Sequence, residues 1–219
     1  MEHRVKLLVS GGTKTVARLA ATHSDCLGVL LTPKNWSSMA FIHGTQLTWA
    51  ADNAAYSGFD VEKFRAMLAK IGQESSAAFI CCPDVVGNAD LTLSLFDVWR
   101  EEVAAYGPPA LVLQDGQEDR DLPDAAAYFI GGTDDFKLSQ AVGELCEEIH
   151  TRFPGQWLHM GRVNSQQRFQ AAFDLGCDSI DGSSASRWSE TWVPKYLAWI
   201  RRIKRQPKLM NGIGVSHRS

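Results

Sequence analysis

Eight short apolar runs, separated by segments with a helical pattern, constrain the fold of this chain more than any other feature. The runs are apolar on both faces, which is typical of parallel strands covered by helices. We therefore predict eight strands, at Val5–Ser10, Leu27–Thr32, Leu47–Asp52, Ala78–Cys82, Ala110–Gln114, Tyr128–Ile130, Trp157–Met160 and Ser179–Asp181.

The intervening segments have the amphipathic spacing of helices. We predict helices at Val61–Ile71, Leu91–Tyr106, Phe136–Phe153, Ser165–Leu175 and Val193–Lys204. This alternation predicts an α/β fold, a compact (β/α)8 TIM barrel that forms a single domain over residues 1–219. The second and fifth connections are too short for full helices. An open doubly wound sheet is the competing fold, but no GxGxxG motif follows the first run.

Composition and charge narrow the classes of partner. Apolar residues make up 45% of the chain and charged residues 21%, as in ordinary globular proteins. The formal net charge is −3, whereas general polyanion binders are usually basic, so any nucleic-acid contact must be local. The chain has no run of about 18 apolar residues and no signal peptide, so we expect no membrane partner and a cytoplasmic location. The five cysteines lack zinc spacing, so we expect buried thiols and no metal.

Polar residues follow most of the predicted strands. Because the carboxyl ends of parallel strands meet on one face of a barrel, these side chains should line a single pocket. The candidates are Asp52, Asp84, Gln114, Gly132 and Asp181. Paired carboxylates suit glycosidic chemistry, in which one attacks or stabilises the anomeric carbon and the other moves protons. A third carboxylate with an amide can read the edge of a heterocycle.

Each candidate also has a purely structural interpretation. A strand-end aspartate can cap a helix or hold a polar turn, and paired glycines can simply bend the chain. His159 is interpreted as a core or rim residue. Lys137 suggests a barrel lyase or aldolase with a Schiff-base lysine, but an exposed helix lysine is the commoner case.

The order of these strand-end motifs resembles that of the tRNA-guanine transglycosylase superfamily. The resemblance is closer to the short, often phage-borne transglycosylase-like proteins linked to 7-deazaguanine in DNA, and it covers Trp49 to Ser184. The matching segments are Asp52-Asn53-Ala54-Ala55-Tyr56, Cys82-Pro83-Asp84, Gln114, Gly131-Gly132, Leu158-His159-Met160-Gly161 and Gly176-Cys177-Asp178-Ser179-Ile180-Asp181. Two features depart from the family: alanines replace the glycines of its first motif, and the zinc-binding subdomain of its tRNA enzymes is missing.

The resemblance implies a base exchange. Guanine in a nucleic acid, with DNA favoured, would be replaced by a 7-deazaguanine such as preQ0 through a covalent aspartyl-glycosyl intermediate, without a cofactor. Asp181 would be the nucleophile and Asp52 the assisting acid or base. The substrate-binding residues would be Asn53, Tyr56, Asp84, Gln114, Gly131, Gly132 and Met160, with Tyr56 and Met160 on either side of the purine ring.

Several alternatives stay open at this point. The same resemblance allows a tRNA-guanine transglycosylase, or a non-catalytic subunit that supports a partner enzyme. The implied partners are DNA or tRNA and a free 7-deazapurine base, with a homodimer or partner proteins as further options.

A basic segment near the end of the sequence is a candidate nucleic-acid clamp. On a helix, Arg201, Lys204, Arg205 and Lys208 share one face, which is either a phosphate-binding strip or a solvated surface. The other candidate track consists of the loops around Arg162, Arg168 and Arg187.

Overall fold

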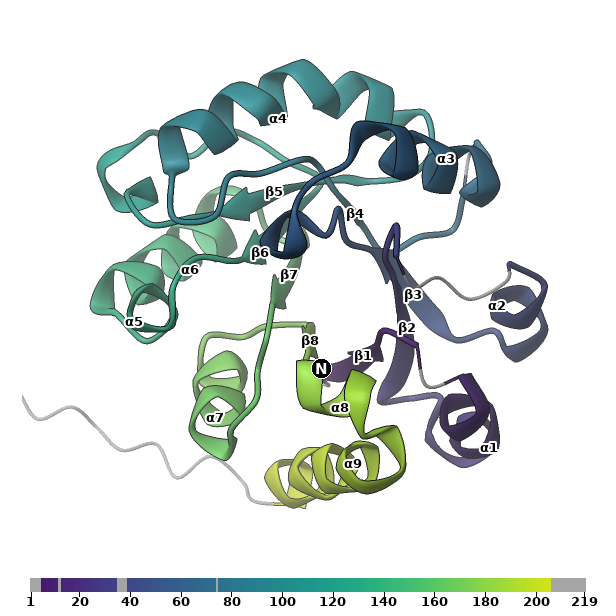
Figure 1. Cartoon of the computed structure of the whole chain (residues 1–219). Coiled ribbons are helices and arrows are strands. Elements are labelled where there is room, and N and C mark those ends of the chain that lie inside the picture. The colour runs from purple at the N-terminus through teal and green to yellow at the C-terminus, as the bar shows by residue number, and fades with distance from the viewer. Residues whose placement is uncertain (1–4, 12, 35–38, 74, 206–219) are drawn as a thin grey trace, which may run out of the picture.

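The computed structural model describes residues 5–11, 13–34, 39–73 and 75–205, and they form a closed barrel of eight parallel strands with helices outside it (Figure 1). The strands are β1 (Lys6–Val9), β2 (Leu27–Leu31), β3 (Thr48–Ala51), β4 (Ile80–Cys81), β5 (Pro109–Leu113), β6 (Ala127–Ile130), β7 (Trp157–Met160) and β8 (Ser179–Asp181). The predicted (β/α)8 TIM barrel is therefore confirmed.

The helices lie outside the barrel, in the connections between successive strands and after β8. They are α1 (Thr13–His23), α2 (Met39–Thr45), α3 (Val61–Ile71), α4 (Ala89–Ala104), α5 (Asp134–Lys137), α6 (Gln140–Arg152), α7 (Gln166–Asp174), α8 (Ser183–Arg187) and α9 (Ser189–Arg205), with short 3-10 turns at η1 (Ala55–Ser57) and η2 (Gln117–Asp119). Among the described residues, no helix is both long and apolar enough to cross a membrane.

Each strand pairs with its neighbours in sequence, and β8 closes the barrel on β1 through the pair Leu7 and Ile180. Side chains alternate between the two faces of each strand. Leu8, for example, lies in the small core inside the barrel, whereas Leu7 and Val9 lie in the larger core between strands and helices. All five cysteines are buried and free, as expected.

The long helix predicted at Phe136–Phe153 is in fact two helices. The chain breaks after α5, and Ser139 begins α6 by accepting a hydrogen bond from the backbone N–H of Val142 at 3.2 Å. Polar caps of this kind satisfy the free N–H groups of a new helix. The break leaves α5 as a single turn at the end of β6, with Phe136 and Lys137 both buried.

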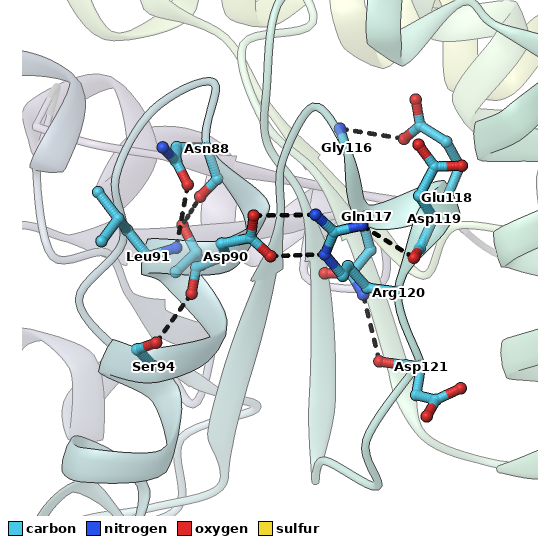
Figure 2. Close-up of polar contacts among 11 residues, drawn as sticks. Asn88, Asp90, Leu91, Ser94, Gly116, Gln117, Glu118, Asp119, Arg120 and Asp121 are labelled. Carbon is cyan, nitrogen blue, oxygen red and sulfur yellow. Dashed lines mark hydrogen bonds and ion pairs between the residues drawn. The ribbon is translucent and has the colours of Figure 1, made fainter.

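The outer ring is thin where the sequence has short connections. Among the described residues, the seven-residue α2 is the only helix between β2 and β3, and the turn η2 is the only one between β5 and β6. Figure 2 shows how the end of η2 is held: Nε and Nη2 of Arg120 donate to the two oxygens of the Asp90 carboxylate, at 2.5 and 2.9 Å. Asn88, beside Asp90, caps α4 by accepting from the N–H of Leu91. The fifth connection is therefore held by an ion pair to α4 in place of a helix of its own.

Candidate active site

A pocket that is open at its mouth lies at the carboxyl ends of the strands. Residues that follow six consecutive strands, β3 to β8, contribute to its wall. They include Asp52, Asn53, Tyr56, Asp84, Gln114, Gly131, Gly132, Lys137, Arg162 and Asp181. The five strand-end residues expected from the sequence to share one pocket are thus brought together.

Asp84 is held in a clamp of two amides. Its Oδ1 accepts from Asn53 Nδ2 and its Oδ2 from Gln114 Nε2, both at 2.7 Å. The Gln114 Oε1 accepts in turn from the N–H of Gly87 at 2.9 Å. Burial raises the pKa of Asp84, and these two hydrogen bonds oppose the rise. A carboxylate has about four acceptor positions, so roughly two remain for a ligand.

Asp52 follows β3 and begins a tight turn. Its Oδ1 accepts from the N–H of Ala54 at 3.0 Å, and Asn53 Oδ1 accepts from that of Ala55 at 2.6 Å. The structural interpretation of this pair as a polar turn is therefore correct, although both side chains also reach the pocket. Burial raises the pKa of Asp52 to about 7, and the nearby charges of Asp181 and Asp84 add to the rise. Asp52 can therefore gain or lose a proton near neutral pH.

Asp181 is oriented by groups that all bind one of its oxygens. Its Oδ2 faces His159 Nε2 at 3.1 Å and accepts from the N–H of Arg162 at 3.2 Å. Its Oδ1 makes no hydrogen bond with any described residue, and Asp181 lines the pocket. One carboxylate oxygen is thus fixed and the other is free to react.

His159 connects Asp181 to a buried hydrogen-bond chain. Trp157 Nε1 donates to Ser179 Oγ at 2.8 Å, and Ser179 Oγ lies 2.7 Å from His159 Nδ1. An indole N–H only donates and an ionised carboxylate only accepts. All three contacts are therefore satisfied when a neutral imidazole carries its proton on Nε2, toward Asp181, and accepts at Nδ1 from the Ser179 hydroxyl. Burial lowers the pKa of His159, which favours this neutral ring. Sequence reasoning placed His159 in the core and missed its contact with Asp181.

Lys137 is the second residue whose position differs from expectation. The sequence favoured an exposed helix lysine, but Lys137 is 2% exposed and lines the pocket. Lys137 is the last residue of the single-turn α5, which follows β6, and the chain breaks before α6 begins. Burial lowers the pKa of Lys137 to about 8, against the attraction of Asp181 and with the help of Arg162.

The two residues expected on either side of a purine ring are separated. Tyr56 lies at the pocket mouth, 65% exposed, with the Arg162 guanidinium 3.7 Å from its ring centroid. Met160 does not line the pocket; it is fully buried in the core between strands and helices. Since side chains alternate along β7, the inward position belongs to His159, and Phe129 and Val112 supply the apolar wall.

Both paired glycines are required by close packing. A Cβ on Gly131 would lie 2.7 Å from Val112 Cγ1 and 2.8 Å from Gln114 Nε2. Gly132 has a φ of 71°, and a Cβ there would lie 2.5 Å from the Phe136 ring. The backbone can therefore approach the pocket only because side chains are absent at these two positions.

The part of α9 that carries Arg201, Lys204 and Arg205, the candidate nucleic-acid clamp, is not near the pocket. The Arg201 side chain contacts His23, the last residue of α1, which lies just before β2 begins at Leu27. The start of β2 is at the amino-terminal end of the barrel, opposite the pocket. Lys204 and Arg205 continue the helix in the same direction, as predicted, and Lys208 lies outside the described residues. Arg162, from the alternative track, lines the pocket instead.

Within the part of the chain that the structure describes, His, Cys, Asp and Glu side chains form no group of three suited to a metal ion. A scan against protein-family models matched none, and a search of curated proteins found no match. The fold and the site define a (β/α)8 barrel with a carboxylate-rich pocket at the usual catalytic face.

Proposed function

We propose that this protein is a base-exchange transglycosylase, which replaces guanine in a nucleic acid, DNA in preference, with a 7-deazaguanine. The observation that carries the proposal is the convergence of Asp181, with one free oxygen, and Asp52, with a pKa near neutrality, beside the Asp84 clamp. This set supplies a nucleophile, a proton carrier and a reader of a purine edge in one pocket.

Recognition of guanine follows from the Asp84 clamp. The amides of Asn53 and Gln114 fix the carboxylate, whose remaining acceptor positions match the N1–H and N2–H donors of guanine. Adenine lacks this pair of donors, so it would leave the buried carboxylate unsatisfied. The pocket lies at the end of a barrel, so the target nucleotide must leave its base stack to enter.

The exchange needs two displacements at C1′. The free Oδ1 of Asp181 forms a bond to C1′ while the bond from C1′ to guanine N9 breaks, and guanine leaves with the electron pair and a proton from Asp52. The incoming 7-deazapurine then returns a proton to Asp52, and its N9 displaces Asp181 from C1′. One glycosidic bond replaces another, so the cycle balances without an oxidant or a nucleoside triphosphate.

Trapping of the covalent intermediate tests the proposal. Wild-type protein incubated with a guanine-containing single-stranded oligonucleotide should give an adduct in intact-protein mass spectrometry. Asp181→Asn should reduce the rate of adduct formation at least about a thousandfold, because an amide is a poor nucleophile. An adduct that forms equally well in Asp181→Asn would remove Asp181 from the mechanism.

Nucleoside analysis distinguishes the alternatives. DNA and tRNA from cells that express the chain and receive a deazaguanine supply should contain the modified nucleoside in DNA. Its appearance only in tRNA would favour the tRNA enzyme. Modification that needs a second protein, and persists with Asp181→Asn, would favour a supporting subunit.

A further inference from the structure

We propose that Lys137 and Arg162 form an anion subsite, which binds a phosphate ester of the nucleotide held at Asp181. The inference rests on the proposed function for the identity of that nucleotide. Its starting observation is that Lys137 is 2% exposed and lines the pocket, while its side-chain ammonium makes no hydrogen bond or ion pair with any described residue. The stem of Lys137 is therefore buried and its ammonium ends at the pocket wall. A desolvated ammonium without a protein partner is unfavourable, and an anionic ligand in the pocket would supply the missing partner.

No described carboxylate forms an ion pair with Lys137. Asp115, which lies after β5 and also attracts Lys137, accepts from the N–H and the hydroxyl of Thr133. Asp134, in the same short helix, forms an ion pair with Arg168. Asp181 attracts Lys137 electrostatically but forms no ion pair with it, and its Oδ2 is occupied by His159 and the Arg162 N–H. The protein therefore balances the charge of Lys137 only through longer-range attraction, and the ammonium at the pocket wall can still bind an anion.

Arg162 supplies a second cation with free donors. Its backbone has a φ of 57°, which turns its N–H toward Asp181, while its guanidinium lies flat over the exposed Tyr56 ring. The N–H groups of the guanidinium make no hydrogen bond with a described residue. A stacked guanidinium presents these donors edge-on, the arrangement that binds phosphate in a fork.

The pocket carries charges of both signs. Asp52 and Asp84 follow β3 and β4, and Lys137 and Arg162 follow β6 and β7, with Asp181 on β8 next to the cations. A nucleotide has groups that complement both, with hydrogen-bond donors on the base and negative charge on the phosphate. Placing the phosphate beside Lys137 and Arg162 also offsets its repulsion of the Asp181 carboxylate.

The binding of a phosphate should be linked to protonation of Lys137. The free amine has a pKa of about 8, and a bound anion favours the protonated form. We therefore expect proton uptake on binding near pH 8.5, and weaker binding of phosphate-bearing ligands as the pH rises above about 8.

Calorimetric titration of deoxyguanosine 5′-monophosphate and of deoxyguanosine tests the subsite. Lys137→Met should weaken binding of the monophosphate by about ten- to a hundredfold, the range for a lost charge-assisted hydrogen bond, and change deoxyguanosine binding little. Lys137→Arg should keep most of the affinity. Lys195→Met is the matched control, because Lys195 is an exposed lysine on α9, and it should behave as wild type.

The outcomes separate the subsite from the proposed function. Inorganic phosphate should raise the melting temperature of the wild type and not that of Lys137→Met. If it does so while neither guanine compound binds, the subsite stands and base exchange fails. Equal losses for nucleoside and nucleotide, no loss for the nucleotide, or an absence of Lys137-dependent binding of any phosphate probe would overturn the subsite.

Discussion

At the residue scale, Asp52 has the most consequential environment. Its pKa of about 7 lies well above the ordinary 3.8, so the folded protein binds a proton that the unfolded chain releases at lower pH. The stabilisation from that proton is complete below about pH 4 and is lost as the pH rises through about 7. The same proton is the one that the proposed mechanism gives to the departing guanine.

We predict that Asp52→Asn changes both properties. Adduct formation by the wild type should fall as the pH rises through about 7, whereas the variant should be slow at every pH, by about a hundredfold or more. The free energy of unfolding of the variant, relative to wild type, should increase between pH 4 and pH 8. Stopped-flow rates and urea titrations over this range measure the two effects. A wild-type rate without a break near pH 7 would contradict the role of Asp52.

Ala54 makes a second prediction at this scale. It adopts a left-handed conformation, with φ 63° and ψ 25°. The corresponding position in the family motif that this segment resembles is a glycine. A side chain in this region costs about 1 kcal/mol, and glycine removes that cost. Glycine also loses more backbone entropy on folding than alanine, which offsets part of the gain. Ala54→Gly should therefore stabilise the protein by about 0.5 kcal/mol, measured by chemical denaturation. Ala55→Gly, in the following 3-10 turn, is the control and should not stabilise.

At the scale of elements, the alternation along β7 decides which side chains reach the pocket. His159 contacts Asp181, while Met160 packs outward in the core. Strand boundaries were predictable from apolar runs, and β7 and β8 begin and end at the expected residues. The side chains of β7 that point into the barrel were not predictable. Both faces of the strand are buried, so the alternation of side chains does not distinguish an apolar face from a polar one.

Met160 tests this orientation directly. Met160→Ala should destabilise the protein by about 2–5 kcal/mol, because it leaves a cavity between strands and helices. Met160→Leu should leave both stability and the affinity for guanine nearly unchanged. If Met160→Leu instead weakens guanine binding in a calorimetric titration, Met160 contacts the ring after all.

The break between α5 and α6 shows a different limit of sequence reasoning. The helical pattern continues across Leu138 and Ser139, so one long helix was expected there. A serine can cap a helix or lie on its surface, and only the tertiary structure chooses between them. The burial of Lys137 depends on that choice and could not be foreseen.

At the scale of the whole molecule, the pocket was predictable because a parallel barrel brings all its strand ends to one face. The same geometry explains why the basic strip is far from it. The outer helices run antiparallel to the strands, so the end of α9 lies at the amino-terminal face. A helical pattern identifies charges that share a face of one helix, but not the end of the barrel at which they lie.

This placement predicts which cations bind a nucleic acid at the site. Arg162→Gln should weaken binding of a guanine-containing oligonucleotide and reduce the salt slope by about one, because one phosphate contact is lost. Arg201→Glu should leave both unchanged. Fluorescence anisotropy at several salt concentrations measures the slopes. The opposite result would place the nucleic-acid track on α9.

The clamp in which Asn53 and Gln114 hold Asp84 also bears on the structure of the barrel. Strand β4 contains only Ile80 and Cys81, and it pairs with β3 through a single register position. The hydrogen bonds of Asp84 to Asn53 and Gln114 join the loops beyond three adjacent strands where the barrel wall is shortest. Asp84 therefore has a structural role that is independent of any ligand, because it links these loops. Under the proposed function, the presence of Asp84 in a relative would therefore not by itself indicate base recognition, whereas the loss of Asp181 would remove the proposed nucleophile.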